Sequence, residues 1–485
     1  MTEPAFVPHP NRNLILAFLM TTMALSSIEG TIVATAMPSI VSSLGGFELY
    51  AWAFSGFLLT QAVFTQILGK WSDIVGRKPV LMISVAVFLV ASIACGFATS
   101  MEMLIFMRLI QGIGAGGIGT TVSTLAADLY TVRERGNIQA MFSAVWGVSS
   151  VLGPLLGGLM VQNFHWAWVF WFSVPFGLVA TWGIWRYLSE DFERKPQRID
   201  LPGSLGLLVS MSALMYMLNL GANTITWIGL IGGGGLLLWR LRTAADPIMP
   251  HELWRDKFIA LATFTGLVGG LMMTGLIAYI PAYVQGVMGA TPMIAGFALT
   301  TLSLGWPVAS SIGGRMIIPR GPTFVVRLAG VAALIGGGLY TLVRPDLGPA
   351  FVATAAFFIG AALGFANTTI IVSVQSVVPW NRRGGVTAVT ILLRLLGNSL
   401  GAAMLGGILN RSLYKGLAEE RFVGVSMREV EGLMNADPAA AGVVADPAVR
   451  TLLAESLQGL HLIVFGIAIV FFVMTLLWPR GKRLV

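Results

Sequence analysis

Three charged side chains interrupt long apolar stretches of the sequence, and they are the residues best suited to chemistry. Glu29 lies in SSIEGTIVATAMP, directly after the run LILAFLMTTMAL, and Arg108 and Arg394 lie in two further apolar runs. A lone ionised carboxylate near the middle of a bilayer is costly, so an acid at such a place is functional by default. A carboxylate that holds a proton until water or a cation arrives is what a proton-coupled carrier needs. The alternative is a structural glutamate that hydrogen-bonds to another helix.

Helical spacing gives these charges polar neighbours. Thr22, Ser26 and Glu29 share one face of a helix, which we expect to point to a central cavity. Gln111 follows Arg108 by one turn on the same face, and the structural alternative for Arg108 is hydrogen bonding to backbone carbonyls of the first helix. Arg394 pairs with a lipid, a backbone carbonyl or an acidic substrate, three alternatives that stay open.

The sequence contains no pattern for other chemistry. Cys95 is the single cysteine, so it has no partner for a disulfide or a cysteine-based metal site. No G-x-x-x-x-G-K-[S/T] loop for ATP phosphates occurs. The four histidines are dispersed, without the spacing of metal ligands: His9, His165, His251 and His461. We therefore expect no metal, no cofactor and no enzymatic activity.

The composition requires a membrane to hold these charges. Of the 485 residues 56% are hydrophobic and 11% are charged, whereas a soluble domain carries about 25% charged residues. The net charge of +8 would suggest nucleic acid in a soluble protein, but here the basic residues lie in short loops between apolar runs, so topology explains them better. The sequence predicts an all-α polytopic membrane protein with no nucleic-acid partner.

Apolar runs of about 20 residues predict about fourteen membrane-spanning helices, the first of them uncleaved. They cover residues 14–36, 51–69, 79–98, 103–127, 138–161, 166–187, 202–220, 224–241, 258–281, 292–314, 322–343, 350–372, 384–409 and 458–478. The segment 410–457 is the one sizeable extramembrane piece, and we expect short amphipathic helices in it.

The basic residues predict the orientation of these helices. With the N-terminus inside, about 22 Lys and Arg residues fall in cytoplasmic segments and about 6 in outer ones, most of these in the long loop that counts least. Both termini are therefore expected in the cytoplasm.

Two motifs combine glycines with charges or proline. The loop GKWSDIVGRK holds Gly69, Asp73, Gly76 and Arg77; Asp73 can cap a helix N-terminus, and Arg77 can pair with an acid. We expect Asp128 to meet Arg77 and latch the outward-open state. The alternatives are a basic turn that only sets topology and a solvated Asp128 without coupling.

The stretch GVSSVLGPLLGG carries the second motif. Its glycines, on one side of a helix, allow a neighbour to approach closely, and its proline bends the helix. A hinge or a seal between two halves would suit an exchanger, and ordinary helix packing is the alternative. The residues concerned are Gly147, Gly153, Pro154, Gly157 and Gly158.

Several of these stretches together resemble one transporter family. GKWSDIVGRK is similar to the signature loop between helices two and three of the major facilitator superfamily, RLIQGIGAG to its helix-four segment, and GPLLGG to the helix-five segment of its antiporters. HWAWVFWFSVPFG and RLLGNSLG resemble stretches of its fourteen-helix drug:proton antiporters (EmrB/QacA type). The resemblance covers the whole chain.

The resemblance implies two six-helix halves, residues 1–190 and 246–485, with two inserted helices and a flanking loop at 191–245. It implies a monomeric, proton-driven exporter of lipophilic drugs or amphiphilic metabolites, most typically in a bacterial inner membrane. Glu29 stands in EGTIV where the family has D-x-T-I-V, and the family's helix-four arginine, here Arg108, is thought to transfer protons or hold the acid's charge. Some relatives work with an envelope partner subunit, which segment 410–457 can dock.

Further cavity residues also follow from the resemblance. These polar groups lie on or beside helices that line the superfamily's cavity: Gln61, Tyr279, Tyr283, Asn367 and Gln375. Each alone more often packs between helices than binds a substrate.

Two departures from the family pattern bear on the substrate. Ala167 and Ser173 stand where the family often has Arg and Asn, and no second mid-membrane acid occurs in the later half, so dications are not expected. The rival functions are a proton symporter for a small metabolite and a non-transporting membrane sensor or assembly partner.

Overall fold

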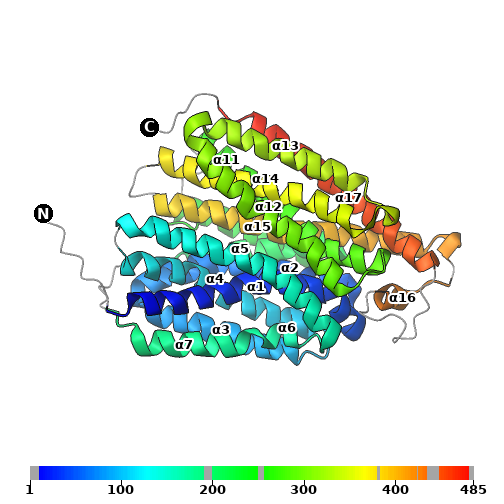
Figure 1. Cartoon of the computed structure of the whole chain (residues 1–485), viewed down its shortest axis with the longest axis horizontal. Coiled ribbons are helices and arrows are strands. Elements are labelled where there is room, and N and C mark those ends of the chain that lie inside the picture. The colour runs from blue at the N-terminus through cyan, green and yellow to red at the C-terminus, as the bar shows by residue number, and fades with distance from the viewer. Residues whose placement is uncertain are drawn as a thin grey trace, which may run out of the picture.

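The computed structural model of the chain describes residues 10–130, 132–190, 199–249, 256–378, 383–422, 424–433 and 447–479. Within these ranges the regular structure is helical throughout, and no strand occurs. The long helices lie side by side along a common direction (Figure 1). We call the end of the bundle where α1 begins the terminal end, and the end that carries α16 the distal end.

Among the described residues, fourteen helices are long and apolar enough to cross a membrane, which confirms the predicted number. In the first half they are α1 (Arg12–Leu44), α2 (Tyr50–Val75), α3 (Arg77–Gly96), α4 (Met101–Leu129), α5 (Val132–Asn163) and one span formed by α6 (Trp168–Trp171) with α7 (Ser173–Tyr187). The inserted pair is α8 (Leu201–Leu220) and α9 (Thr224–Thr243). The second half holds α11 (Lys257–Ala282), α12 (Pro292–Arg320), α13 (Pro322–Thr341), α14 (Gly348–Val377), α15 (Arg383–Leu417) and α17 (Pro447–Leu476).

The helix ends follow from local sequence. Asp200, Asn223 and Asp256 accept hydrogen bonds from free backbone N–H groups at the starts of α8, α9 and α11. Gly76 separates α2 from α3 with a φ of 114°, a left-handed value that favours glycine. Short polar connections thus return the chain through the bundle in alternating directions.

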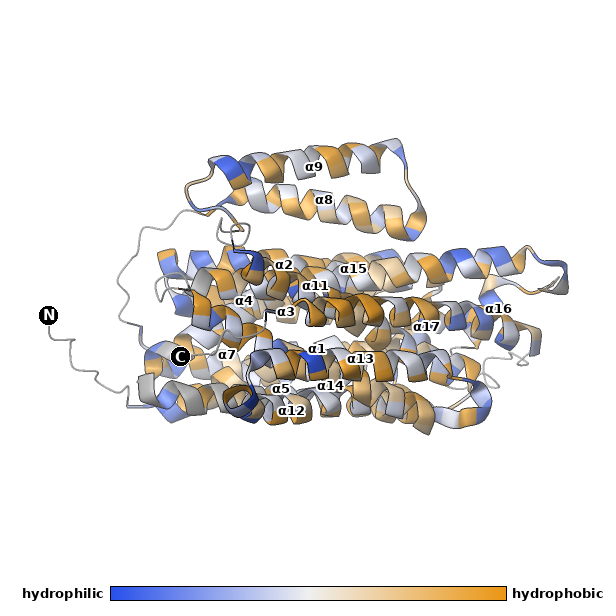
Figure 2. Cartoon of the chain, turned by 90° about the horizontal axis from the view of Figure 1, so that it is seen from above, coloured by the Kyte–Doolittle hydropathy of each residue, from blue (hydrophilic) through white to orange (hydrophobic). Residues whose placement is uncertain are grey.

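Two helix pairs join the halves, α2 with α15 and α5 with α12. The inserted α8 packs on both α2 and α15, and it lies with α9 along one side of the bundle (Figure 2). Ser399 of α15 donates a hydrogen bond to the carbonyl of Ser55 on α2 at 2.5 Å and lies 3.5 Å from the sulfur of Met215 on α8. The inserted hairpin therefore covers the α2–α15 seam.

The last two spans extend beyond their predicted limits. α15 continues to Leu417, not 409, and α17 begins at Pro447, not 458, so the connecting piece is shorter than 410–457. Polar residues end the apolar runs, but the helices continue because Leu413, Leu452 and Leu453 are buried where they pack together. The piece contains α16 (Met427–Gly432) and a 3₁₀ turn at Glu420–Phe422, and residues 434–446 lie outside the described ranges.

Close packing of α8 on α15 depends on the absence of a side chain at Gly407. A Cβ there would collide with the backbone of Leu218, whereas a Cβ at Gly466 on α17 meets nothing within 4 Å. We expect Gly407→Ala to lower stability by about 1–3 kcal/mol, as overpacking does. Gly466→Ala should keep or raise it, since alanine favours a helix. Thermal unfolding in detergent measures both, and an equal response would contradict a tight α8–α15 contact.

Candidate functional site

Glu29 and Arg108 form a buried ion pair in the first half. The Arg108 Nη1 donates to Glu29 Oε1 at 2.8 Å, and each residue is 1% exposed. Glu29 comes from the middle of α1 and Arg108 from the first third of α4. Breaking such a pair by removing one partner leaves an uncompensated charge, so the two residues stabilise each other's presence inside the bundle.

Arg108 has two further hydrogen-bond partners. Its Nε donates to the carbonyl of Ala53 on α2 at 3.2 Å, and Nη1 also donates to Gln111 Oε1 at 2.7 Å. Its guanidinium carbon lies 4.1 Å from the centroid of the Phe57 ring, a cation–π contact. The backbone partner expected on the first helix is thus on α2, and the first helix contributes Glu29.

Gln111 extends this network to α3. Its Nε2 donates to Ser92 Oγ at 2.7 Å, and the Cys95 thiol lies 4.0 Å from its Oε1. Ser92, Cys95 and Gln111 are 0% exposed. Four helices therefore meet at one polar cluster in an apolar interior.

Thr22 and Ser26 lie on the α1 face that carries Glu29, as the spacing predicts. Both are buried, and the Thr22 hydroxyl donates to the carbonyl of Phe18 at 2.9 Å. Neither contacts the ion pair through a hydrogen bond, so they supply polar surface one and two turns nearer the terminal end.

The glycines of α5 lie on two faces, not on one side as the motif suggested. A Cβ at Gly153 would collide with the Thr31 side chain of α1 and lie close to the Ile28 carbonyl, and a Cβ at Gly157 would collide with the Ile32 carbonyl. Gly158 faces α12 in the other half, as does Gly147, which meets Pro307 there.

Pro154, inside α5, completes the second face. Its carbonyl approaches Gly296 of α12 closely enough to exclude a side chain. The spacing of 153, 157 and 158 allows both contacts because successive residues on a helix are rotated by about 100°. α5 therefore joins the helix of Glu29 to the other half.

Residues 69–78 were expected to form a tight loop, but they are the end of α2, Gly76 and the start of α3, and they pack onto their neighbours through charges. Arg77 forms an ion pair with Asp128, as expected, and its guanidinium also lies 3.6 Å from Asp73. The carboxylate that caps α3 is Glu190, not Asp73. Glu190 accepts the N–H of Arg77 at 2.7 Å and that of Lys78 at 2.8 Å. Glu190 is distant in sequence, and no local spacing signals its role.

Two further contacts hold residues 69–78 in place. Gly69 lies against Thr120 of α4, where an added Cβ would make ordinary contact at 3.6 Å. Lys70 pairs with Asp246 at 2.7 Å, which ties α2 to the segment that leads into the second half.

Four of the remaining cavity candidates lie apart from the ion pair. Tyr279 stacks on Tyr50 with ring centroids 5.5 Å apart, and Tyr283 lies 5.2 Å from the His461 ring. Gln375 donates to the Thr387 hydroxyl at 3.3 Å. Gln61 is partly buried, and its backbone carbonyl accepts a hydrogen bond from the Thr65 hydroxyl at 2.6 Å.

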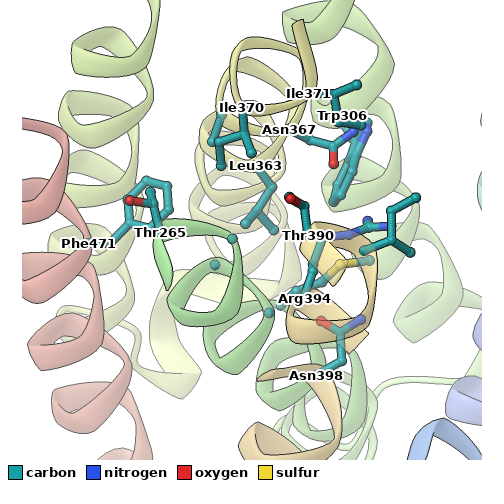
Figure 3. Close-up of a pocket in the computed structure, with 16 residues that line it drawn as sticks. Thr265, Trp306, Leu363, Asn367, Ile370, Ile371, Thr390, Arg394, Asn398 and Phe471 are labelled. Carbon is teal, nitrogen blue, oxygen red and sulfur yellow. The ribbon is translucent and has the colours of Figure 1, made fainter. Parts of the chain in front are cut away.

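Asn367 and Arg394 do come together, in a cavity of the second half (Figure 3). The cavity lies among α11, α12, α14, α15 and α17, and its volume is ≈ 20 Å³, room for about one water molecule. Across the described ranges, no three His, Cys, Asp or Glu side chains gather as metal ligands do.

The fold and the buried charges define a class, that of polytopic α-helical transporters. The chain is similar in fold to a bacterial homologue of the human lysosomal transporter Spinster in an inward-facing, unoccupied conformation, with a TM-score of 0.70 and 17% identity, covering 97% of this chain and 98% of that one. It is also similar in fold to the nucleoside transporter NupG, with a TM-score of 0.62 and 14% identity over 96% and 100% of the two chains.

The sequence gives the family. The profile of the Major Facilitator Superfamily matches residues 19–402, and the chain belongs to this superfamily. It is 32% identical to "Multidrug resistance protein 3" of Bacillus subtilis, over 81% of this chain and 78% of that protein. It is 30% identical to "Multidrug transporter protein MdtP" of the same organism, over 82% and 75%.

A double-mutant cycle tests whether the buried pair acts as a unit. Arg108→Met alone should lower stability by about 3–5 kcal/mol because it leaves Glu29 buried without a counter-charge. Adding Glu29→Leu should restore most of that loss, since a buried pair can be replaced by apolar groups at little cost. Thermal unfolding of the four proteins in detergent gives the coupling. Strictly additive losses would mean that the two side chains do not depend on each other.

Proposed function

We propose that the protein is a proton-coupled antiporter that exports lipophilic drugs or amphiphilic metabolites by alternating access, with Glu29 as the coupling acid. The observation that carries the proposal is the fully buried ion pair of Glu29 with Arg108 in the middle of the first half. A purely structural pair of this kind could be replaced by apolar packing, so its presence in a membrane interior favours a functional role. The names of the two Bacillus relatives support a drug-type substrate.

Proton binding changes the charge balance of the cluster. The deprotonated Glu29 accepts a hydrogen bond from Arg108, whereas a protonated Glu29 no longer balances the guanidinium. Arg108 then loses its counter-charge and must turn to Gln111, to the carbonyl of Ala53 or to entering water. The two protonation states of Glu29 thus favour different arrangements of α1 and α4.

α5 is the element that can pass this difference to the other half. It contacts α1 at Ile28 and Ile32, one residue before and three residues after Glu29, and it contacts α12 on its opposite face. Thr300 of α12 also donates to the carbonyl of Val151 on α5 at 3.3 Å. A shift of α1 against α5 therefore acts directly on the seam between the halves.

Opening of the distal end requires four hydrogen bonds to break. Tyr50 donates to the carbonyl of Ala278 at 2.5 Å, Gln285 to that of Thr35 at 3.3 Å, and Asn410 to that of Glu48 at 2.7 Å. The N–H of Phe47 donates to Glu431 of α16 at 2.9 Å. The pairs of Arg77 with Asp128 and of Lys70 with Asp246, at the terminal end, act as the opposing latch.

We propose export toward the side of the distal end. The basic residues of the terminal-end loops favour the cytoplasm for that end, and the membrane we propose is a bacterial inner membrane. Protons then reach Glu29 from outside and leave to the cytoplasm while substrate moves outward. The proton gradient is the only energy source, no cofactor is involved, and one protein chain is the transport unit. The distal piece with α16 is the surface for any envelope partner subunit.

Two alternatives predict different results. A symporter would accumulate a metabolite in the direction of proton flow, whereas the GPLLGG stretch of α5 resembles the helix-five segment of this superfamily's antiporters. A sensor or assembly partner would move no substrate at all.

Proton exchange in everted vesicles tests the proposal. Wild type, Glu29→Gln and Glu102→Gln are expressed equally in cells that lack their main drug pumps, and a quenched dye reports acidity as lipophilic compounds are added. Wild type should release protons with at least one compound, and Glu29→Gln should lose about 90% or more of this release. A residual release of about one tenth or less corresponds to about 1.4 kcal/mol or more of lost coupling. Glu102, exposed in the first turn of α4, is the control acid and should behave as wild type.

Two outcomes contradict the proposal. An equal response of wild type and Glu29→Gln would make Glu29 structural. Uptake that rises with an inward proton gradient would instead establish symport.

A further inference from the structure

The second half contains a polar cavity that the proton-coupling cluster does not use. Thr390, Arg394 and Asn398 follow one another on successive turns of α15 and border it, and Trp306 of α12 and Asn367 of α14 lie across from them (Figure 3). The other lining residues are mostly apolar and include Met273, Leu363, Ile370 and Phe471. A few polar groups in an apolar cavity are typical of small-molecule sites.

Arg394 is a cation without a counter-charge. Within the described ranges no Asp or Glu lies at ion-pair distance from it, and it makes no hydrogen bond to the protein. Arg394 is partly buried, and its guanidinium carbon lies 5.6 Å from the centroid of the Trp306 ring, a contact that does not replace a counter-charge. Of the three charges inside the apolar runs, Glu29 and Arg108 cancel, and Arg394 leaves the interior positive.

Asn398 supplies the second, independent observation. It is 6% exposed, and its Oδ1 has no hydrogen-bond partner among the described residues. A buried acceptor without a donor is costly, and such groups call for an explanation. Asn398 is one turn from Arg394 on the same helix face, so one ligand can reach both side chains.

Packing holds these two residues in place. Gly270 of α11 lies against the backbone between Arg394 and Asn398, and a Cβ there would collide with it. Gly397 and Gly401 approach the carbonyls of Leu267 and Leu271 on α11 in the same way. The R-x-x-G-x-S-x-G stretch therefore fixes α15 by its glycines and seam serine and leaves Arg394 aimed at the cavity.

We propose that this cavity is the subsite for the acidic group of an amphiphilic substrate. Arg394 binds a carboxylate or a similar anion, Asn398 Oδ1 accepts an N–H or O–H beside it, and Trp306 with the apolar side chains receives an aromatic or aliphatic body. Guanidinium groups match the geometry of carboxylates and bind them through paired hydrogen bonds. The substrate class is thus an anionic or zwitterionic amphiphile with a donor next to its acid. This inference rests on the proposed export function and adds the charge of the substrate.

The cavity is nearly closed in this state. Its volume of ≈ 20 Å³ is too small for an amphiphile. α11, α12 or α14 must therefore move away from α15 before a substrate can bind. α12 is also the second-half partner of α5, so one helix borders both the cavity and that seam.

A matched pair of fluorescent ligands tests the subsite. Dansylglycine carries a carboxylate, an adjacent sulfonamide N–H and an aromatic body, and its methyl ester lacks only the charge. The purified full-length protein in detergent is titrated with each, and the rise in emission on entry into an apolar site is followed. Arg394→Gln should weaken binding of dansylglycine by about ten- to hundredfold and leave the ester within about twofold of wild type.

The remaining variants separate charge, geometry and folding. Arg394→Lys should retain part of the affinity for the acid, because it keeps the charge and loses the paired geometry. Asn398→Ala should weaken acid and ester alike, since both carry the N–H. Arg242→Gln removes an exposed arginine of α9 and should change neither. Ester binding by the Arg394 and Arg242 variants shows that their cavity is folded, and thermal unfolding checks the fold of Asn398→Ala.

Three results would overturn the subsite. The first is equal binding of dansylglycine by wild type and Arg394→Gln. The second is an equal loss for acid and ester in Arg394→Gln. The third is saturable displacement by phosphatidylglycerol and not by phosphatidylcholine, which would assign Arg394 to a lipid headgroup.

Failure of this inference is distinguishable from failure of the export proposal. Binding is measured without a proton gradient, and Glu29→Gln should keep the Arg394-dependent binding of the acid. Arg394-dependent binding without proton exchange would reject export alone. Glu29-dependent exchange without any effect of Arg394 would reject the acidic subsite alone.

Discussion

The arrangement of the first half depends on one interaction, the buried pair of Glu29 with Arg108. An arginine inside an apolar bundle requires hydrogen-bond partners, and α1, α2 and Gln111 supply them for Nε and Nη1 of Arg108. The glycines that follow Arg108 make this possible. Gly112 lies against the backbone of Phe57 on α2, and Gly114 against that of Ser84 on α3, so that α4 sits close to both. In the R-x-x-Q-G-x-G stretch the arginine thus supplies the charge, the glutamine a hydrogen-bond partner for it, and the glycines the close packing of α4 on α2 and α3.

The two halves communicate through two seams of different character. α5 meets α12 mainly through glycine, proline and backbone, and the Thr300 hydroxyl on the carbonyl of Val151 is a side-chain contact across this seam. α2 meets α15 through hydrogen bonds such as Ser399 to Ser55 and Gln66 to the carbonyl of Ala388 at 3.0 Å, and α8 covers this seam. In our proposal the first seam carries the movement and the second guides it. The cation of the second half, Arg394, lies on α15 and the coupling acid on α1, so proton and substrate charges occupy different halves.

The sequence predicted those features that depend on residue type and short-range spacing. Fourteen apolar runs gave the fourteen helices because the bilayer sets a minimum length of apolar chain. Glu29, Arg108 and Arg394 were recognisable because charges are rare in such runs. Contacts between distant segments were not predictable in the same way. Glu190 caps α3 across more than a hundred residues, and Asn398 is one of several buried amides until its unpartnered oxygen is seen beside Arg394. The two faces of α5 were missed because glycine spacing does not show which neighbour lies on which side.

Infrared difference spectroscopy of the full-length protein in lipid tests the central claim that Glu29 exchanges its proton for substrate. The carbonyl stretch of a protonated carboxylic acid is followed at a pH where wild type shows it, before and after addition of a transported compound. We predict that the compound removes this band in wild type and in Glu102→Gln, and that the band is missing from Glu29→Gln. A band that persists in Glu29→Gln, or that substrate leaves unchanged in wild type, would contradict the coupling role of Glu29.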